Sequence, residues 1–159
     1  MSREKSERRS RTPAAVSKVD TLASSILILQ SEGEGFVDIT GEIRAFVAET
    51  RAMSGALTIF LRHTSASLTI QENADPDVLR DLVSALQRLA PAEAGWRHVT
   101  EGPDDMPAHV KTMLTATSLQ IPIIGGELML GTWQAVYLIE HRTKPHRREA
   151  VLQFIGEAR

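Results

Sequence analysis

The feature of this sequence that most constrains its fold is the recurrence of large apolar residues at every second position in residues 56–63. Leu57, Ile59 and Leu61 follow this spacing, and side chains two residues apart lie on the same face of a β-strand. The next position on that face is His63. We therefore expect a strand that is buried on one side and that ends with an imidazole.

Six further segments have the apolar composition and the boundaries of strands. They are residues 22–30, 35–40, 66–72, 118–124, 127–142 and 149–157. The Glu-Gly-Glu-Gly turn predicts a hairpin between the first two of these segments, and Gly125-Gly126 predicts a hairpin of 118–124 with 127–142. Strands therefore dominate the predicted fold.

Helical patterns interrupt the strands at irregular intervals. The clearest begins at Asp75, a preferred N-cap residue, with Pro76 at the first helical position and Asp77 in the first turn. Its apolar face comprises Val78, Leu79, Leu82, Val83, Leu86 and Leu89. Shorter patterns cover residues 41–50 and 106–114. Two or three helices among many strands favour an α+β fold over a doubly wound sheet.

Composition limits both the class of the chain and its chemistry. The 159 residues, of which 42% are apolar and 24% charged, are typical of one globular domain, which we expect to span residues 19–159. No apolar run is long enough to cross a bilayer, and the residues after Met1 lack the apolar core of a signal peptide, so we expect a cytoplasmic protein. The sequence has no cysteine, so histidine, aspartate or glutamate must hold any metal.

The basic residues are unevenly distributed along the chain. Residues 1–18 hold six of the 18 basic residues and only two of the 20 acidic ones. This segment is also poor in large apolar side chains, so we expect a disordered basic arm that is either a solvated extension or a contact for a partner. The remaining chain is acidic, which does not favour nucleic acid as a partner.

Histidines are the first candidates for a site. The five are His63, His98, His109, His141 and His146. Two of them, His63 and His141, follow the apolar face of a predicted strand to its end, and His109 lies four residues after Asp105, on the same face of a short helix. Three neutral imidazoles with an open position make a catalytic type of metal site. Each of these histidines alone is equally explained as a hydrogen-bonded structural residue, and His98 and His146 are not candidates.

Four other residues have the chemistry of a site. Asp104 and Asp105 are adjacent carboxylates in a proline-bounded loop, suited to a divalent metal or a general base, or simply to a polar loop. Arg142 can bind a phosphate with two hydrogen bonds, or form a surface ion pair. Trp133, placed on the face of His141 if 127–142 is one strand, can stack on a flat ring or belong to the core.

Three separated stretches of the chain resemble the YjbQ family. They are HTSASLTIQENADPDV, EGPDDMPAHVK and SLQIPIIGGELMLGTWQAVYLIEHR. The resemblance covers roughly residues 19–157. It implies an α+β fold with a β-sandwich-like core of mixed sheets, assembled as a homotrimer, and some family members have a weak thiamine-phosphate synthase activity.

The same resemblance carries site residues over to this chain. The histidines of the family correspond to His63, His109 and His141, and its acidic loop corresponds to Asp104 and Asp105. Where the family has three acids in a row, this chain has Pro103 before two. The resemblance therefore implies a divalent metal, which we expect to be zinc, manganese or magnesium.

Three functions are consistent with these residues. The first is a metal-dependent enzyme that acts on a small phosphorylated metabolite, as in thiamine-phosphate synthesis, with Arg142 holding a phosphate and Trp133 a ring. The second is a hydrolase that uses metal-bound hydroxide, with Asp105 as general base. The third is a trimeric protein that binds a small anion without catalysis.

Overall fold

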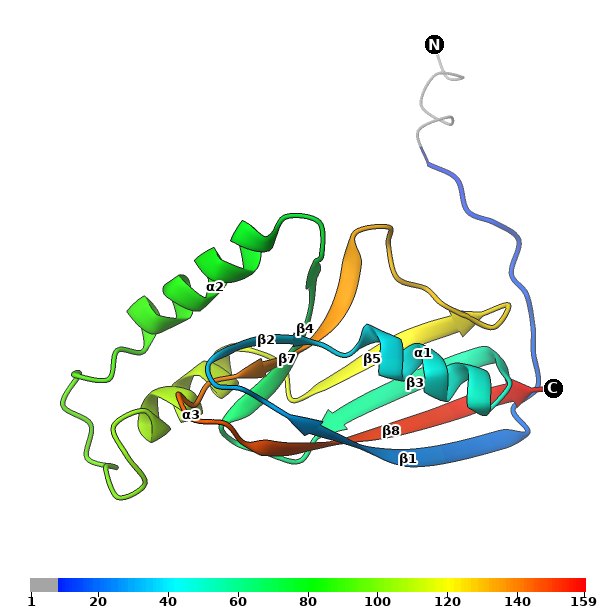
Figure 1. Ribbon diagram of the computed structural model, residues 1–159. Coiled ribbons are helices and arrows are strands. Elements are labelled where there is room, and N and C mark those ends of the chain that lie inside the picture. The colour runs from blue at the N-terminus through cyan, green and yellow to red at the C-terminus, as the bar shows by residue number, and fades with distance from the viewer. Residues whose placement is uncertain (1–8) are drawn as a thin grey trace, which may run out of the picture.

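The computed structural model describes residues 9–159. Residues 1–8, which belong to the expected basic arm, lie outside the described residues. Residues 9–20 contain no helix or strand, and all of their side chains are exposed. Figure 1 shows this segment leading away from the body of the molecule before the first strand begins. No helix within residues 9–159 is long and apolar enough to cross a membrane.

A five-stranded antiparallel sheet forms one layer of the body. Its strand order is β1 (Thr21–Gln30), β8 (Arg147–Ala158), β3 (Ala52–Leu61), β5 (Ser118–Ile124) and β6 (Glu127–Leu128). The expected alternation in the third strand is confirmed, because Leu57, Ile59 and Leu61 are all buried. Their face of the sheet therefore supplies the floor of the core.

A second, three-stranded antiparallel sheet lies over one end of the first. It comprises β2 (Gly35–Asp38), β7 (Gln134–Glu140) and β4 (Ala66–Glu72) in that order. The central strand β7 is buried at six of its seven positions. Both of its faces are thus covered, so β7 reads as a continuous apolar run rather than an alternation.

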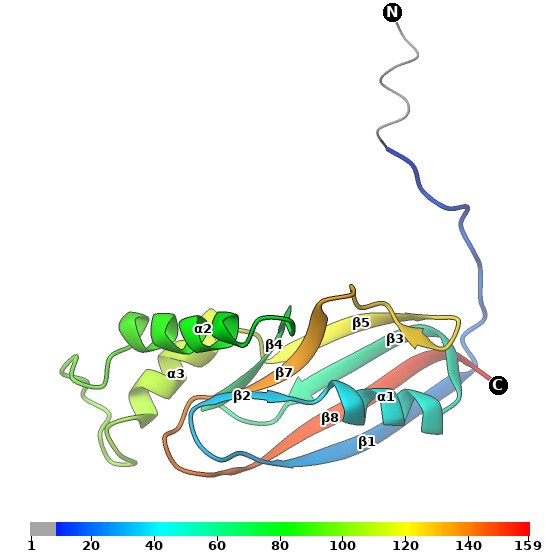
Figure 2. The ribbon, with the colours of Figure 1, turned by 45° about the horizontal axis from the view of Figure 1, so that its top comes forward.

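Helix α1 (Thr40–Glu49) lies over the same face of the large sheet, beside the small one (Figure 2). Ile43, Phe46 and Val47 are its buried apolar residues, at the i, i+3 and i+4 spacing of one helix face. They join a single hydrophobic core with Leu57 and other strand residues. Helix and small sheet therefore form one layer, and the large sheet forms the other.

Two further helices lie together at one end of the molecule, α2 (Pro76–Leu89) and α3 (Asp105–Leu114) (Figure 1). The predicted start of α2 is confirmed: the Asp75 side chain accepts a 2.9 Å hydrogen bond from the backbone N–H of Asp77. Although α2 has a pronounced apolar face, none of its residues is buried. That face is incompletely covered within one chain.

One predicted hairpin and the length of one predicted strand differ from the structure, whereas the hairpin at Gly125-Gly126 forms between β5 and β6. Segments 22–30 and 35–40 are both strands but lie in different sheets, because β1 pairs along its full ten residues with β8, whereas β2 pairs with β7. The segment 127–142 is not one strand. Its first two residues form β6, a connection covers residues 129–133, and β7 begins in the other sheet at Gln134.

The predicted fold class is confirmed. The chain forms a mixed α+β structure in which the described residues provide three helices and two antiparallel sheets. The small sheet, α2 and α3 meet at one end (Figure 1), and a pocket lined by Asp104, Lys111 and His141 lies among these elements.

Candidate functional site

Helix α3 places a carboxylate and an imidazole on one face of its first turns. Asp105 is the first residue of the helix and His109 lies one turn later. The Asp105 Oδ2 atom is 3.1 Å from His109 Nε2, as the i, i+4 spacing predicts. Asp105 is only 2% exposed although it is charged, so its environment must supply compensating partners.

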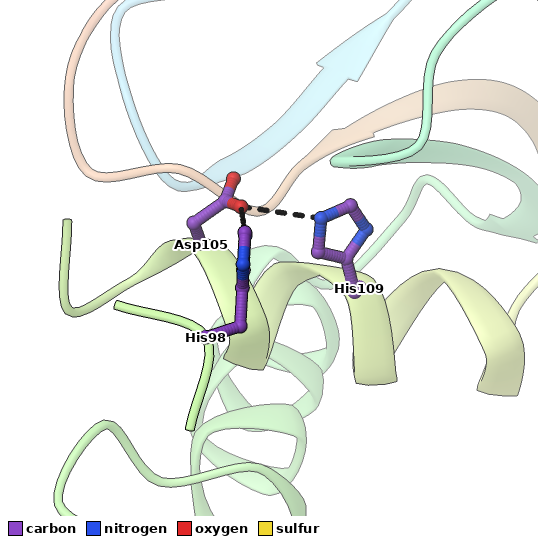
Figure 3. Close-up of side chains that lie close together, drawn as sticks. All are labelled: His98, Asp105 and His109. Atoms are coloured by element: carbon purple, nitrogen blue, oxygen red, sulfur yellow. Dashed lines mark hydrogen bonds and ion pairs between the residues drawn. The ribbon is translucent and has the colours of Figure 1, made fainter. Parts of the chain in front are cut away.

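A second imidazole reaches the same oxygen from the loop that precedes α3. His98 Nε2 lies 2.8 Å from Asp105 Oδ2. Figure 3 shows the two rings converging on this carboxylate from either side. One ligand atom from each of these three residues lies within 4.8 Å of the others, and no other such group occurs among residues 9–159. We call His98, Asp105 and His109 the HDH cluster.

The other oxygen of Asp105 is held by an arginine. Arg142 Nη1 donates to Asp105 Oδ1 over 2.5 Å, and Arg142 Nη2 donates to the carbonyl of Glu101 over 2.7 Å. Burial acts to raise the pKa of Asp105, but the hydrogen bond from His98 and the positive charge of Arg142 outweigh it, so this pKa lies below its ordinary value. Asp105 is thus ionised and fixed in orientation.

Asp104 has a different task from its neighbour. Its Oδ2 atom accepts hydrogen bonds from the backbone N–H and the hydroxyl of Thr143 over 2.8 and 3.0 Å. Burial opposes ionisation, yet these bonds and Arg142 lower the pKa of Asp104 to about 2. Arg142 Nε is 3.2 Å from Asp104 Oδ2 but is not directed at it, and Nε is without a hydrogen-bond partner among the described residues. Asp104 fastens the chain that follows β7.

The HDH cluster suits a divalent metal. Two imidazoles and one carboxylate are a ligand set of catalytic zinc sites and of other transition-metal sites that keep positions open for water or substrate. The separations from Asp105 Oδ2, 2.8 and 3.1 Å, are a few tenths of an ångström shorter than the roughly 3.3 Å between ligands of a tetrahedral site with bonds of about 2.0 to 2.1 Å. A small outward movement of the two rings provides that space.

His141, a predicted metal ligand, lies outside this cluster. It follows the last residue of β7, is 2% exposed, and its Nε2 atom is 2.8 Å from Ser67 Oγ. Burial is the main cause that lowers the pKa of His141 to about 4, and the charge of Lys111 adds to it. His141 is therefore a neutral, hydrogen-bonded residue of the wall next to the site.

His63, also a predicted ligand, lies in a third setting. It follows β3, and its Nε2 atom accepts a 2.8 Å hydrogen bond from the backbone N–H of Glu149. Burial and Arg148 lower its pKa, in agreement with a neutral ring whose Nε2 lone pair is already engaged. His63, His109 and His141 thus do not come together within one chain, and a shared centre among them stays a prediction about an assembled form.

The remaining predicted site residues also divide. Arg142 adjoins the HDH cluster, but its guanidinium is engaged by Asp104, Asp105 and a backbone carbonyl. Trp133 lies in the connection before β7 and is 64% exposed. It lines a pocket with Gln71 and Glu72 that shares no residue with the pocket beside Asp104. Stacking of a ring on Trp133 therefore stays a prediction for a separate surface.

A pocket of about 280 Å³ lies at the C-terminal end of α2, and its lining includes Asp104, the neighbour of Asp105, but none of the three residues of the HDH cluster. Asp104, Thr143 and His141 line one side. Its lining also includes Lys111 of α3, which is only 4% exposed and forms an ion pair with Glu34. Sequence reasoning identified neither residue of this pair.

His98 and Lys111 carried different signals in the sequence. His98 comes from an irregular loop, where no periodicity indicates which way a side chain points. Lys111 lies three and four positions after Ala108 and Pro107, which are buried on α3, so helical spacing puts it on the buried face. A lysine on such a face is a candidate for a paired, functional charge.

Comparisons with known proteins agree with the fold and with the resemblance in the sequence. The family model described as UPF0047 protein YjbQ-like matches residues 24–157. A UPF0047 protein of Synechocystis sp. is 50% identical over 133 residues, which cover 83% of this chain and 90% of that protein. The UPF0047 protein YjbQ of Escherichia coli is 39% identical over 132 residues, or 82% of this chain and 96% of that protein.

Solved structures have the same fold. A crystal structure of a YjbQ/UPF0047-family protein from Clostridium acetobutylicum superposes with a TM-score of 0.74 at 36% identity, covering 83% of this chain and 98% of that one. A protein from Aeropyrum pernix superposes with a TM-score of 0.78 at 25% identity, covering 85% and 99%. The chain described here, with its two antiparallel sheets and its loop-and-helix HDH cluster, belongs to the YjbQ/UPF0047 family.

Proposed function

We propose that this protein is a metal-dependent enzyme that acts on a small phosphorylated metabolite at the end of the molecule where α3 begins. The observation that carries the proposal is the convergence of His98 Nε2, Asp105 Oδ2 and His109 Nε2 within 4.8 Å. In this proposal His98 and His109 replace the predicted set of three histidines. A divalent metal bound there supplies positive charge that stabilises the negative charge developing on a phosphate or pyrophosphate leaving group.

The neighbouring residues then have defined tasks. Arg142 holds Asp105 Oδ1 and so aims Oδ2 at the two imidazoles. Glu140 fixes that stretch of chain in turn: its Oε1 accepts a 2.9 Å hydrogen bond from the backbone N–H of Arg142, while Arg148 pairs with both of its oxygens. Arg142 is therefore a positioning residue rather than a phosphate ligand, since its Nη1 and Nη2 groups already have partners and its Nε is buried.

The size and lining of the pocket at the end of α2 support the choice of substrate class. A volume of about 280 Å³ suits a compound of metabolite size, and Lys111 provides a cation at its wall. Thiamine-phosphate synthesis, in which a thiazole phosphate displaces pyrophosphate from a pyrimidine, is the reaction that we propose to test first, because its leaving group requires this kind of charge stabilisation.

The hydrolase alternative has less support. It assigns to Asp105 the task of a general base, but one oxygen of Asp105 is bound to Arg142 and the other faces two imidazoles. A general base needs a free oxygen within reach of the attacking water. The order of preference is therefore metal-assisted group transfer first and hydrolysis second.

We further propose that the protein acts as a homotrimer. The outward face of the large sheet supports association, because five large apolar side chains on β1, β3 and β8 are each about half exposed or more. These are Leu22, Ile26, Ile28, Phe60 and Ile155. The uncovered face of α2 supports it as well. Contiguous apolar surface of this kind marks a protein–protein interface.

Metal content and turnover in matched variants test the proposal. Protein purified without a nickel column and treated with chelator is titrated with zinc or manganese, and product formation from thiazole phosphate and pyrimidine pyrophosphate is followed. We expect about one metal per chain in the wild type. His98→Ala and His109→Ala should lose both metal and turnover, whereas His146→Ala should keep both. Turnover that persists in a metal-free His109→Ala variant would refute the metal-dependent mechanism.

A further inference from the structure

The pocket at the end of α2 contains a lysine whose burial destabilises the fold unless a negatively charged group lies beside it. Lys111 is 4% exposed, and an isolated buried ammonium is strongly destabilising. Its partner is the carboxylate of Glu34, which Lys111 Nζ contacts through Oε1. An ammonium donates three hydrogen bonds, and among the described residues Glu34 is its one hydrogen-bond acceptor. The pair therefore leaves donors of Lys111 available at the pocket wall.

The turn that carries Glu34 is built to hold it over the pocket. Glu34 stands between Gly33 and Gly35, whose φ angles of 140° and 150° are rarely adopted by other residues. A Cβ atom on Gly33 would lie 2.7 Å from the carbonyl oxygen of Thr143, so the turn packs directly against the chain that lines the pocket. Backbone geometry thus delivers this carboxylate to Lys111.

The same carboxylate also holds the rim of the pocket. Glu34 Oε2 accepts a 2.8 Å hydrogen bond from Gln87 Nε2, near the end of α2. One side chain therefore joins α2 to α3 across the pocket. Asp104 Oδ2 is held by the backbone and hydroxyl of Thr143 and lies beside Arg142. Glu34 is half-buried, with a side chain that is 17% exposed, and it is held at the pocket by side-chain contacts with Lys111 and Gln87. Displacement of its carboxylate therefore breaks side-chain contacts only.

We propose that Glu34 is an internal substitute for the anionic group of the ligand: it neutralises Lys111 while the pocket is free, and a phosphate or pyrophosphate group displaces it. The proposal rests on the proposed function for the choice of a phosphate compound, but it requires no metal. A phosphate oxygen would take the position of Glu34 Oε1 and the free donors of Lys111. His141 is neutral beside it, whereas Asp104 and Glu93, which also line the pocket, oppose a further anion.

Competition by Glu34 has a measurable consequence. Removal of its charge in Glu34→Gln leaves the shape of the turn unchanged and frees Lys111 to attract an anion. A tenfold change in Kd corresponds to about 1.4 kcal/mol, and the interaction energy of a close charge pair near a surface is larger than this. We therefore expect the Kd of Glu34→Gln for pyrophosphate to be lower than that of the wild type by about tenfold or more. Lys111→Met should abolish binding, and Glu32→Gln, an exposed acid in the same turn, should leave the Kd unchanged.

Isothermal titration of chelator-treated, metal-free protein with inorganic pyrophosphate tests the inference. A lower Kd for Glu34→Gln than for the wild type, with no change for Glu32→Gln, supports it. An equal or higher Kd for Glu34→Gln, or the absence of binding to both proteins, overturns it. Should Lys111→Met fail to fold, the comparison of the two glutamine variants still decides the question.

The metal-free conditions separate this inference from the function proposed above. Pyrophosphate binding that responds to Glu34→Gln, together with a failure to bind metal at the HDH cluster, would leave the inference standing and the metal-dependent enzyme refuted. Metal binding without any effect of Glu34→Gln on pyrophosphate would give the reverse result. A larger rise in melting temperature on adding pyrophosphate to Glu34→Gln than to the wild type is a second readout of the same displacement.

Discussion

At the scale of single residues, the two oxygens of the Asp105 carboxylate bind different partners, and this explains the geometry of the site. One oxygen is bound by Arg142 and the other faces His98 and His109. A buried carboxylate with only one of these partners would retain either an uncompensated charge or a free rotation. With both sets of partners, the Asp105 carboxylate is ionised and fixed in orientation, as a metal ligand requires.

Replacement of Arg142 should therefore weaken metal binding without removing a ligand. In Arg142→Met the Asp105 carboxylate loses the partner that orients it, and changes of this kind lower metal affinity by roughly 10- to 100-fold. Zinc titration should show the weaker Kd with the stoichiometry unchanged. Arg62→Met, at an exposed ion pair with Glu149, is the control. Wild-type affinity in Arg142→Met would contradict the positioning role.

The buried imidazole of His141 should make stability depend on pH. Its pKa is lowered from 6.5 to about 4 in the folded chain, so between these values the unfolded chain binds the proton first. Stability is therefore complete above about pH 6.5 and decreases as the pH falls toward 4, by about 3 kcal/mol in total. His63, whose pKa is also lowered, acts in the same direction.

Urea unfolding at pH 7, 5.5 and 4.5 and at one protein concentration measures this dependence. His141→Gln keeps a hydrogen-bonding group beside Ser67 but does not titrate, so its free energy of unfolding should fall less steeply over this range. The stabilising contribution of Asp104 is present above its unfolded pKa of 3.8 and is lost only as the pH falls from there toward 2, so it does not interfere. Equal slopes for the variant and the wild type would show that His141 is not the group responsible.

Residue types and local spacing predicted part of this site, and tertiary packing decided the rest. The pairing of Asp105 with His109 follows from helical spacing alone. The approach of His98 does not, because it depends on the path of an irregular loop. For Arg142 the sequence leaves a phosphate contact and an ion pair equally open, and only the structure shows that it is paired with two aspartates and a carbonyl.

At the scale of elements, helix α2 depends on few contacts. It has no buried residue, and its defined anchors are the Asp75 cap at one end and the hydrogen bond from Gln87 to Glu34 at the other. Elements with little buried surface open locally without unfolding of the core. The helix that borders the pocket is therefore expected to be the least protected regular element of this end.

Loss of the Asp75 helix cap should reduce hydrogen-exchange protection in α2 alone. Asp75→Ala removes the acceptor for the N–H of Asp77, which costs about 1 kcal/mol and corresponds to roughly fivefold faster local opening. Hydrogen exchange should show that loss of protection in residues 76–89 and no change in β8. A uniform loss of protection across the whole chain would mean that α2 is instead part of the cooperative core.

The strands illustrate what the sequence can and cannot specify at this scale. Apolar periodicity located nearly every strand, but it did not identify the partner of each. β1 and β2 are adjacent in sequence, yet the ten-residue register of β1 with β8 places them in different sheets. Similarly, residues 127–142 have the composition of one strand, but a connection at residues 129–133 moves the chain to the second sheet.

At the scale of the whole molecule, the outward face of the large sheet predicts self-association. A charge among these apolar side chains, as in Ile26→Glu on the edge strand β1, should be buried on assembly and should therefore dissociate the trimer. Light scattering after size exclusion should give a mass of three 17.5 kDa chains for the wild type and one for the variant. Val16→Glu, in the exposed N-terminal segment, should remain trimeric. A trimeric Ile26→Glu would place the interface elsewhere.

The chain thus presents two charged features at one end, the HDH cluster and a lysine-lined pocket. They adjoin through Asp104 and α3, which belongs to both. A phosphorylated compound in the pocket would lie at the same end of the molecule as the HDH cluster, although none of the three cluster residues lines the pocket. Whether that cluster binds metal decides between this account and one centred on His63, His109 and His141.

Anomalous X-ray diffraction from crystals of metal-free protein soaked in zinc, recorded on both sides of the zinc absorption edge, tests the central claim most directly. The account predicts one anomalous peak per chain, within about 2.2 Å of His98 Nε2, Asp105 Oδ2 and His109 Nε2. A peak bound by His63 or His141 instead, or no peak at the HDH cluster, would contradict it.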